Sequence, residues 1–197
     1  MPRPRARLDP TAVTRAFAPD GLHGATTTAI ARCAGVAKPT IYAHGTSKEA
    51  IFLACVETEV ERLVSRLSAA DVESRESPAR ARLSVLAGAI IAHGHEHPAA
   101  ARLLHQTARH ASSAVAGDVD AALARLVARI ATILRESTTP ACADRIAPAL
   151  LGAAAAYAVA DAADPYRDAA VLGEAFAQAL ERPDHTTGEG VRSIGLY

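Results

Sequence analysis

The sequence predicts an all-helical (all-α) protein of about nine helices, and three observations support this fold class. Half of the 197 residues are apolar, so most of the chain can contribute to a buried core. Aromatic residues make up only 4% while alanine is abundant, which favours packed helices over sheets. Glycine and proline fall in separated clusters that divide the chain into long segments.

The first 50 residues contain the signals of three short helices. An Asp-Pro pair at 9–10 marks a helix start, and the sequence PDG at 19–21 marks its end. After a loop, LHGA, the threonines at 26–28 can cap a second helix, which Gly35 ends. A third short helix is expected over about 37–44.

Longer helices are expected in the rest of the chain. Ser47 caps a helix that reaches about Leu67, with apolar residues at helical spacing. The sequence DVESRESPAR interrupts it and begins a fifth helix, which HGHEHP ends. Four more helices are expected at about 98–111, 118–136, 141–162 and 166–181. The last residues, 183–197, lack periodicity and are predicted to form a disordered tail.

The formal net charge is zero, but the charges are unevenly distributed. Residues 1–50 contain seven basic and three acidic residues, while residues 51–197 contain fourteen basic and eighteen acidic ones. The first segment therefore carries a net charge of +4 and the second −4. A basic segment joined to an acidic one is typical of a polyanion-binding module on a separate sensing or dimerising domain.

Cysteine usage and apolar runs predict the cell compartment. Cys33, Cys55 and Cys142 form no CxxC pair, which favours reduced thiols, with Cys33 and Cys55 as small core residues. The first ten residues contain arginines but no apolar stretch, so they do not resemble a signal peptide. The apolar run from Ala149 is short and rich in alanine, so it is not expected to span a bilayer. We therefore expect a soluble, cytoplasmic protein.

The spacing within residues 27–44 predicts a helix-turn-helix. Two short helices that cross steeply need a small residue at the crossing and a residue that tolerates positive φ at the corner; Ala31 and Gly35 supply these. The buried side is formed by Ile30, Ala34, Val36 and Ile41. The outward face of the second helix carries Lys38, Thr40, Tyr42 and His44, all able to hydrogen-bond to phosphates or base edges. An ordinary corner between bundle helices, with these residues merely solvated, is the alternative.

The stretch TTTAIARCAGVAKPTIYAHGTSKEAIF resembles the DNA-binding domain of the tetracycline-repressor (TetR) family. The shared pattern is a threonine-rich helix start, then I-A-x-x-A-G-V, then T-[LI]-Y-x-[HY], then [SN]-K-E, and it is specific over residues 10–53. The resemblance implies a helix-turn-helix DNA-binding domain at about 1–50, with the motif itself at 25–44. It further implies an effector-binding and dimerisation domain at 51–182. The implied function is a homodimeric regulator, usually a repressor, that a small molecule releases from a near-palindromic operator in double-stranded DNA.

The resemblance also implies roles for individual residues. Family members contact bases at the positions of Ala37, Lys38, Pro39 and Thr40, and phosphates at those of Thr27, Tyr42, His44 and Lys48. Lys38 and Thr40 are the best candidates for sequence readout. Gly45 departs from the family pattern, which has a large apolar residue there, and losing a buried Phe costs about 3–5 kcal/mol. A second hypothesis is therefore a helical ligand-binding or interaction protein whose DNA-binding head is degenerate.

Histidines at 93–97 raise the possibility of a metal site. On a helix, His93 and His97 would share a face, and a third ligand such as His105 or His110 would be needed. The glycine within the run and the proline after it indicate a helix end instead. We expect no metal or other cofactor, and we keep a metal-sensing regulator only as a third hypothesis. No catalytic motif is present, so we do not expect an enzyme.

Two features of the second half bear on partners. The small-residue segment 141–163 can pack at a dimer interface or in a monomer core, and the resemblance favours the interface. Polar residues in otherwise apolar helices are candidates for lining an effector pocket. These candidates are His105, Gln106, Arg109 and Tyr157.

Overall fold

The structure is a computed structural model that describes residues 8–43, 47–107, 115–160 and 164–181. These residues form ten helices and no strand, which confirms the all-helical fold class. The first five helices are α1 (Pro10–Phe17), α2 (Gly21–Gly24), α3 (Thr27–Ala34), α4 (Lys38–Ala43) and α5 (Lys48–Ser74). The others are α6 (Ala79–Glu96), α7 (Pro98–Thr107), α8 (Ala116–Leu134), α9 (Pro140–Val159) and α10 (Pro165–Glu181).

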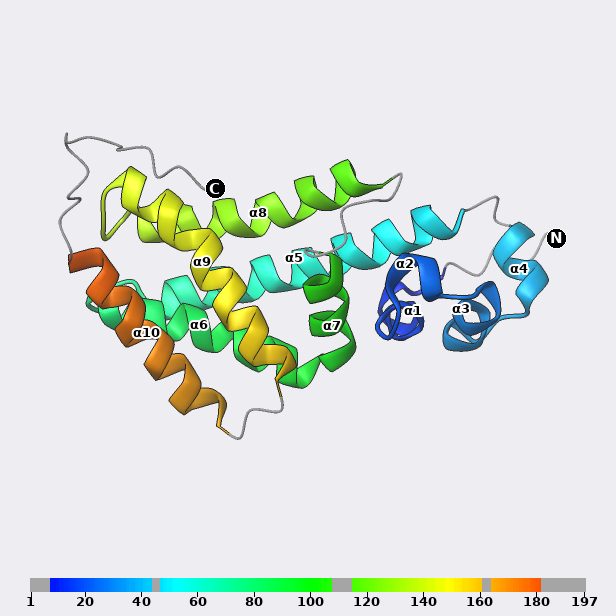
Figure 1. The fold of residues 1–197 in the computed structure, drawn as a ribbon, viewed down its shortest axis with the longest axis horizontal. Helices are drawn as coiled ribbons and strands as arrows, with labels where there is room; N and C mark the ends of the chain where they lie inside the picture. The colour runs from blue at the N-terminus through cyan, green and yellow to red at the C-terminus, as the bar shows by residue number, and fades with distance from the viewer. Residues whose placement is uncertain (1–7, 44–46, 108–114, 161–163, 182–197) are drawn as a thin grey trace, which may run out of the picture.

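The molecule is elongated, with two groups of helices joined by one long helix (Figure 1). Helices α1 to α4 form one end, which we call the head, and α6 to α10 form the other, which we call the body. The 27-residue α5 runs from the head along the body, packing against α1 at its start and against α6 and α8 further on. A change in the body can therefore reach the head through a continuous helix.

The helix starts follow the capping signals of the sequence. Asp9 accepts a hydrogen bond from the backbone N–H of Thr11, and Ser47 accepts one from the N–H of Ala50. The head differs from the prediction at 21–24, where a single helical turn, α2, replaces the expected loop. The buried Leu22 anchors this turn in the core, so tertiary packing decides its conformation.

One hydrophobic core runs through the head and into the body. In the head, Phe17 of α1 meets Phe52 of α5 edge to face, with ring centroids 5.2 Å apart. Phe52 is 3% exposed, so this ring joins α1 to the first turns of α5. Gly45, the position that departs from the family pattern, lies outside the described residues.

Close approaches between helices shape the body. A Cβ added to Gly94 of α6 would clash with the Cβ of Ala158 on α9. A Cβ added to Gly173 of α10 would lie 2.8 Å from the Cα of Ser84 on α6. Both glycines are therefore required by close helix packing.

The end of α5 differs from the one that the sequence predicted. Helix α5 continues to Ser74 rather than ending near Leu67, because Ala70, Asp71 and Ser74 are buried against the body. Helix α9 contains Pro148 in its interior without ending there.

The apolar run from Ala149 belongs to α9, close to the range of about 141–162 that the sequence predicted. Helix α9 has 20 residues, and by length and composition alone it is the one described helix that could cross a membrane. It packs against α6 and α8 within the body, and a helix of a soluble core passes the same test. This packing buries 33% of its apolar window, so much of the apolar surface of α9 stays exposed in the structure.

The three cysteines carry free thiols. Cys55 and Cys142 are buried, whereas Cys33 is only half-buried, so the prediction of a core residue is correct for Cys55 and overstated for Cys33. Burial raises the pKa of the Cys55 thiol to about 12, which keeps it protonated and unreactive.

Candidate nucleic-acid interface and body cavity

The corner between α3 and α4 has the geometry of a helix-turn-helix. Thr26 caps α3 by accepting a hydrogen bond from the N–H of Ala29 at 3.1 Å. Gly35 ends α3 with φ of +67°, in the left-handed region, and the next residue, Val36, donates its N–H to the carbonyl of Ala31 at 3.0 Å. A Cβ on Gly35 would meet nothing within 4 Å, so backbone conformation alone requires glycine at this corner.

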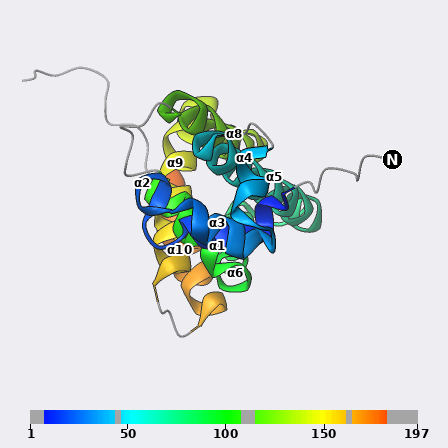
Figure 2. The same ribbon diagram turned by 90° about the vertical axis from the view of Figure 1, so that its right-hand side faces the viewer.

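Helix α4 lies at the free end of the head, which faces the viewer in Figure 2. Its inner side is anchored by Ile41, which is 3% exposed. The exposed residues here are Ala37, just before the helix, and Lys38 and Pro39, in its first turn. Thr40 is half-buried. A short helix is thus held on the core with its first turn presented outward, which is the arrangement a recognition helix needs.

The expected phosphate contacts lie around this corner. Thr27 is the first residue of α3 and is half-buried. Lys48, at the start of α5, donates from Nζ to the carbonyls of Ala25 (3.2 Å) and His23 (3.5 Å). Lys48 therefore ties α5 to the segment before α3, and its ammonium has a third donor left. Tyr42 lies near the end of α4, while His44 is outside the described residues.

The body contains a cavity of about 400 Å³, within the usual range for small-molecule sites. Helices α5 to α9 all contribute to its walls, with Leu63, Leu104, Leu126, Val127 and Leu151 among the apolar residues. Its polar side chains are those of His93 and His105, and no Asp, Glu, Lys or Arg of the described residues lines it. Pro148 and Gly152 of α9 also line it, and both are exposed.

The four residues predicted to line a pocket lie in different places. His105 lines the cavity, but Gln106, the next residue on α7, points to the head. Its Nε2 donates to the carbonyls of Ala18 at 3.0 Å and Pro19 at 2.9 Å, at the end of α1. Tyr157 packs half-buried against the core and is not in the lining, and Arg109 lies outside the described residues.

Sequence reasoning missed a buried polar cluster beside the cavity. His93 of α6, which lines the cavity, has its Nε2 atom 4.0 Å from Oε2 of Glu59 on α5. Glu59 also contacts Arg62, whose Nη1 donates to Oε1 at 3.4 Å. Burial lowers the pKa of His93 to about 4, helped by the charges of His97 and Arg66. Burial raises the pKa of Glu59, against the lowering effect of the Arg62 charge.

The histidine cluster does not form a metal site in the described part of the chain. His93 and His97 do share a face, with ring centroids 5.0 Å apart. No group of three His, Cys, Asp or Glu side chains that could hold an ion occurs among the described residues. His110, one possible third ligand, lies outside them.

Comparison with known proteins agrees with this geometry. Residues 11–55 match the family model described as "Bacterial regulatory proteins, tetR family". A TetR-like transcriptional regulator from Rhodococcus sp. RHA1 is 27% identical with a TM-score of 0.71, over 91% of this chain and 98% of that one. No curated protein sequence matches the chain.

Two further structures show the same fold at lower identity. The fatty acid degradation regulator FadR from Bacillus halodurans is 19% identical with a TM-score of 0.67, over 87% of this chain and 95% of that one. FadR from Bacillus subtilis, in complex with stearoyl-CoA, is 17% identical with a TM-score of 0.68 and the same two coverages.

The helix-turn-helix, the helical body and the matching fold define a DNA-binding transcriptional regulator. Residues 11–55 carry the N-terminal domain of the TetR family, and the chain as a whole has the fold of a TetR-like transcriptional regulator.

Proposed function

We propose that this chain is a homodimeric repressor that leaves a near-palindromic DNA operator when a small molecule occupies the body cavity. The observation that carries the proposal is that a single chain combines an outward-facing α4 with an apolar cavity of about 400 Å³. In this proposal, residues 1–50 bind DNA, residues 51–182 bind the effector and dimerise, and 183–197 form a tail. The protein acts in the cytoplasm, and its role is regulatory rather than catalytic.

The proposed DNA contacts follow from the placement of α4. Two recognition helices in a dimer would enter successive major grooves about 34–36 Å apart. Lys38 and Thr40 would read base edges, while Ala37 and Pro39 would contact thymine methyl groups. The phosphate contacts would come from Thr27, Tyr42, His44 and the remaining donor of Lys48.

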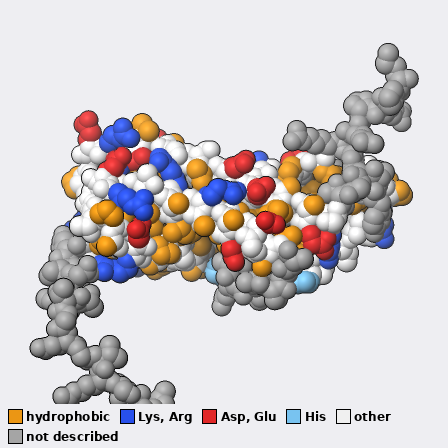
Figure 3. Space-filling model, turned by 90° about the horizontal axis from the view of Figure 1, so that it is seen from above, with side chains coloured by type: hydrophobic (Ala, Val, Ile, Leu, Met, Phe, Trp, Pro, Cys, Tyr) orange, Lys and Arg blue, Asp and Glu red, His pale blue; other side chains and the backbone are white. Residues whose placement is uncertain are grey.

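The proposed dimer face lies on α9 and α10. The exposed side of α9 includes the small residues Ala149, Gly152 and Ala156, which allow a second helix to approach closely. Val171 of α10 is 51% exposed. Figure 3 shows hydrophobic side chains on the surface over α8 and α9, among charged ones. An apolar surface of this kind is favourable to bury against a second copy.

Helix α7 offers a short route from the cavity to the head. Leu104 and His105 line the cavity, and the next residue, Gln106, bonds the end of α1. A ligand that displaces this turn of α7 would therefore act on the head directly, provided that it binds one arrangement better than the other. The stearoyl-CoA complex of FadR from Bacillus subtilis supports the idea that a regulator of this fold can accept an apolar chain.

Operator binding by Lys38→Ala tests the proposed DNA interface. Loss of one base contact in each half-site, at about 1 kcal/mol apiece, should weaken binding to the operator about 30-fold per dimer. Binding to unrelated DNA should weaken much less, so specificity falls. Arg102→Ala is the matched control, because Arg102 is an exposed basic residue of α7 in the body. Equal effects of both substitutions would favour a helical ligand-binding protein with a degenerate head.

A further inference from the structure

Gly152 of α9 has no packing reason to be a glycine. A Cβ added to it would meet no atom within 4 Å, whereas a Cβ on Gly94 or Gly173 would clash with a neighbouring helix. Its φ is not positive either, since the described glycines with positive φ are Gly21 and Gly35. Glycine disfavours a helix interior compared with alanine, so its presence in the middle of α9 requires another explanation.

Gly152 lies at the rim of the body cavity. Gly152 and Pro148, one turn apart on the same face of α9, are the two exposed members of the described lining. The lining residues from α5 and α6 are buried, whereas Leu123 and Val127 of α8 are half-buried. The cavity therefore opens to the surface between α8 and α9, two helices that diverge from their connection in Figure 1.

Pro148 also disfavours a regular helix at this rim. It has no backbone N–H, so α9 lacks one hydrogen bond in the turn where the cavity opens. Proline and glycine are the residues that least favour a helix interior, and here they stand one turn apart. Neither carries a long side chain that could cover the opening. Access to the cavity would account for both residues, although each weakens α9 as a helix.

A longer side chain at position 152 would lie across the opening. Side chains on a helix lean toward its N-terminus and cover the preceding turn. A leucine at this position would therefore lie over Pro148, the other rim residue. Its Cβ would have open space around it, so no neighbouring atom would force the side chain away.

We propose that apolar molecules enter the cavity between α8 and α9, past Gly152, and that the missing side chain there sets the width of molecule that can pass. This inference rests on the proposed role of the cavity as the effector site. The entrance is bordered by Leu123, Val127 and Leu151, which favour an apolar molecule. Gly152 thus controls the rate and the size limit of entry, while the buried lining residues hold what has entered.

Stopped-flow fluorescence on the full-length protein without DNA tests this inference. The probe is N-phenyl-1-naphthylamine, an uncharged apolar dye, and its association rate is measured. Gly152→Leu should slow association about tenfold, because the new side chain has to move aside before the dye can pass. Ala149→Leu is the matched control, since Ala149 is exposed on α9 but outside the lining, and it should change the rate by less than about twofold. Equal rates in all three proteins, equal slowing by both substitutions, or no dye uptake by the wild-type protein would overturn the proposal.

A second copy of the chain offers a different reason for a glycine, because Gly152 also borders the proposed dimer face. A partner helix packed closely against it would exclude even a Cβ, so Gly152→Ala would then dissociate the dimer. An open entrance tolerates alanine, so Gly152→Ala should keep its mass in sedimentation and unfold at a higher urea concentration than the wild type. Dissociation of the Gly152→Ala protein would assign the glycine to the interface and contradict its role at an entrance.

A reversible block guards against a folding defect in the leucine variant. Gly152→Cys can be modified with benzyl methanethiosulfonate and then restored with dithiothreitol. Wild-type protein treated in parallel reports on Cys33, the half-buried free thiol. Modification should slow dye association and reduction should restore it, in Gly152→Cys but not in the wild type. A modified Gly152→Cys protein that takes up the dye at its original rate would refute the entrance.

Dye entry and operator binding fail independently of each other. Stopped-flow association reports on the cavity, whereas operator titration reports on the head. Slowed entry in Gly152→Leu without any operator binding would refute the repressor and leave the entrance standing. Operator binding together with unchanged dye entry would do the reverse.

Discussion

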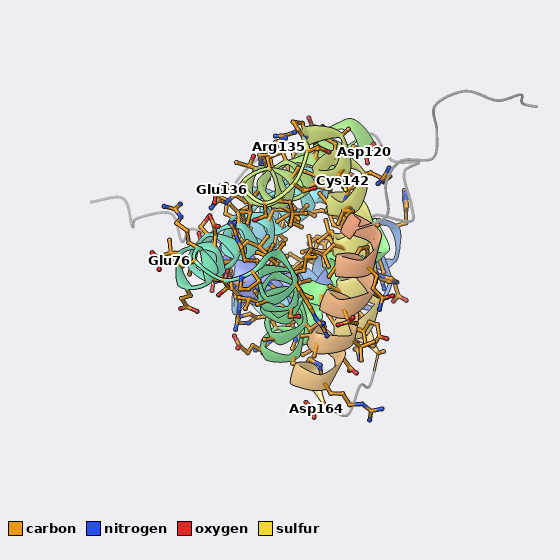
Figure 4. All side chains as sticks on the ribbon, turned by 90° about the vertical axis from the view of Figure 1, so that its left-hand side faces the viewer. Glu76, Asp120, Arg135, Glu136, Cys142 and Asp164 are labelled. Atoms are coloured by element: carbon orange, nitrogen blue, oxygen red, sulfur yellow. The ribbon has the colours of Figure 1, made fainter. Side chains whose placement is uncertain are left out.

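Arg82 of α6 joins α5 to the segment that follows α8, and its removal should strongly destabilise the protein. The side chain is 4% exposed, and Nη2 donates to Oδ1 of Asp71 on α5 (2.8 Å) and to Oε2 of Glu136 after α8 (3.0 Å). Nη1 donates to Oγ of Ser137 at 2.8 Å. Figure 4 shows Glu136 at the end of the body away from the head. Asp71 also accepts a bond from Arg129 at 3.0 Å.

The expected magnitude follows from burial. Removing one partner of a buried ion pair leaves the other charge poorly compensated, which typically costs about 3–5 kcal/mol. Arg82→Met keeps the aliphatic bulk and removes the charge, so its free energy of unfolding should fall by about this amount. In a chain of this size, each kcal/mol lowers Tm by roughly 2–4 °C, so Tm should fall by about 6–20 °C.

Urea unfolding and calorimetry at equal protein concentration measure the effect, since dimerisation makes Tm depend on concentration. The matched control is Arg80→Met on the same helix, because Arg80 is 67% exposed and pairs with Glu174 at the surface. That change should cost less than about 1 kcal/mol. Asp71→Leu combined with Arg82→Met should be less destabilising than the sum of the two single changes. Equal stability of the Arg82→Met and Arg80→Met variants would refute the reasoning.

Three further predictions concern the corner, the body and the contact between body and head. Gly35→Ala places an alanine in the left-handed region without any clash, so it should lower the free energy of unfolding by about 1–2 kcal/mol and weaken operator binding. Gly117→Ala in α8, also in open space, should instead raise the free energy of unfolding by about 0.5–1 kcal/mol. Urea unfolding measures both changes. Gly173→Ala should lower the free energy of unfolding by about 1–3 kcal/mol. Adding Ser84→Ala should not restore stability, because the new Cβ of residue 173 would still meet the backbone of α6. Full restoration in calorimetry would contradict this packing. Gln106→Ala should speed amide hydrogen exchange in α1 about fivefold by removing both bonds to its end, and unchanged exchange would show that these bonds do not hold the head.

Local signals made the head predictable from its sequence. Capping side chains, a glycine at a left-handed corner and apolar spacing are all read within a few residues. Asp9, Ser47 and Gly35 therefore mark the observed helix boundaries. The turn α2 was missed because Leu22 is placed by the core of the head, which no local pattern encodes.

The body was less predictable because its features depend on contacts between distant segments. The sequence placed Gln106 in a pocket, yet it bonds residues 87 and 88 positions earlier in the chain. Glu59 and His93 lie 34 positions apart, and only the packing of α5 on α6 brings them together. The one sequence signal that could have drawn attention to Glu59 is a carboxylate among the apolar positions of an amphipathic helix.

The measurement that tests the central claim most directly is a titration of the purified protein into a labelled DNA fragment from upstream of its own gene. A scrambled fragment serves as the control, and both are titrated at low and physiological salt. The account predicts tight binding to the upstream fragment that persists at physiological salt, with binding to the scrambled fragment lost. Equal binding to both that disappears with salt would show only phosphate attraction, and would contradict a sequence-reading head.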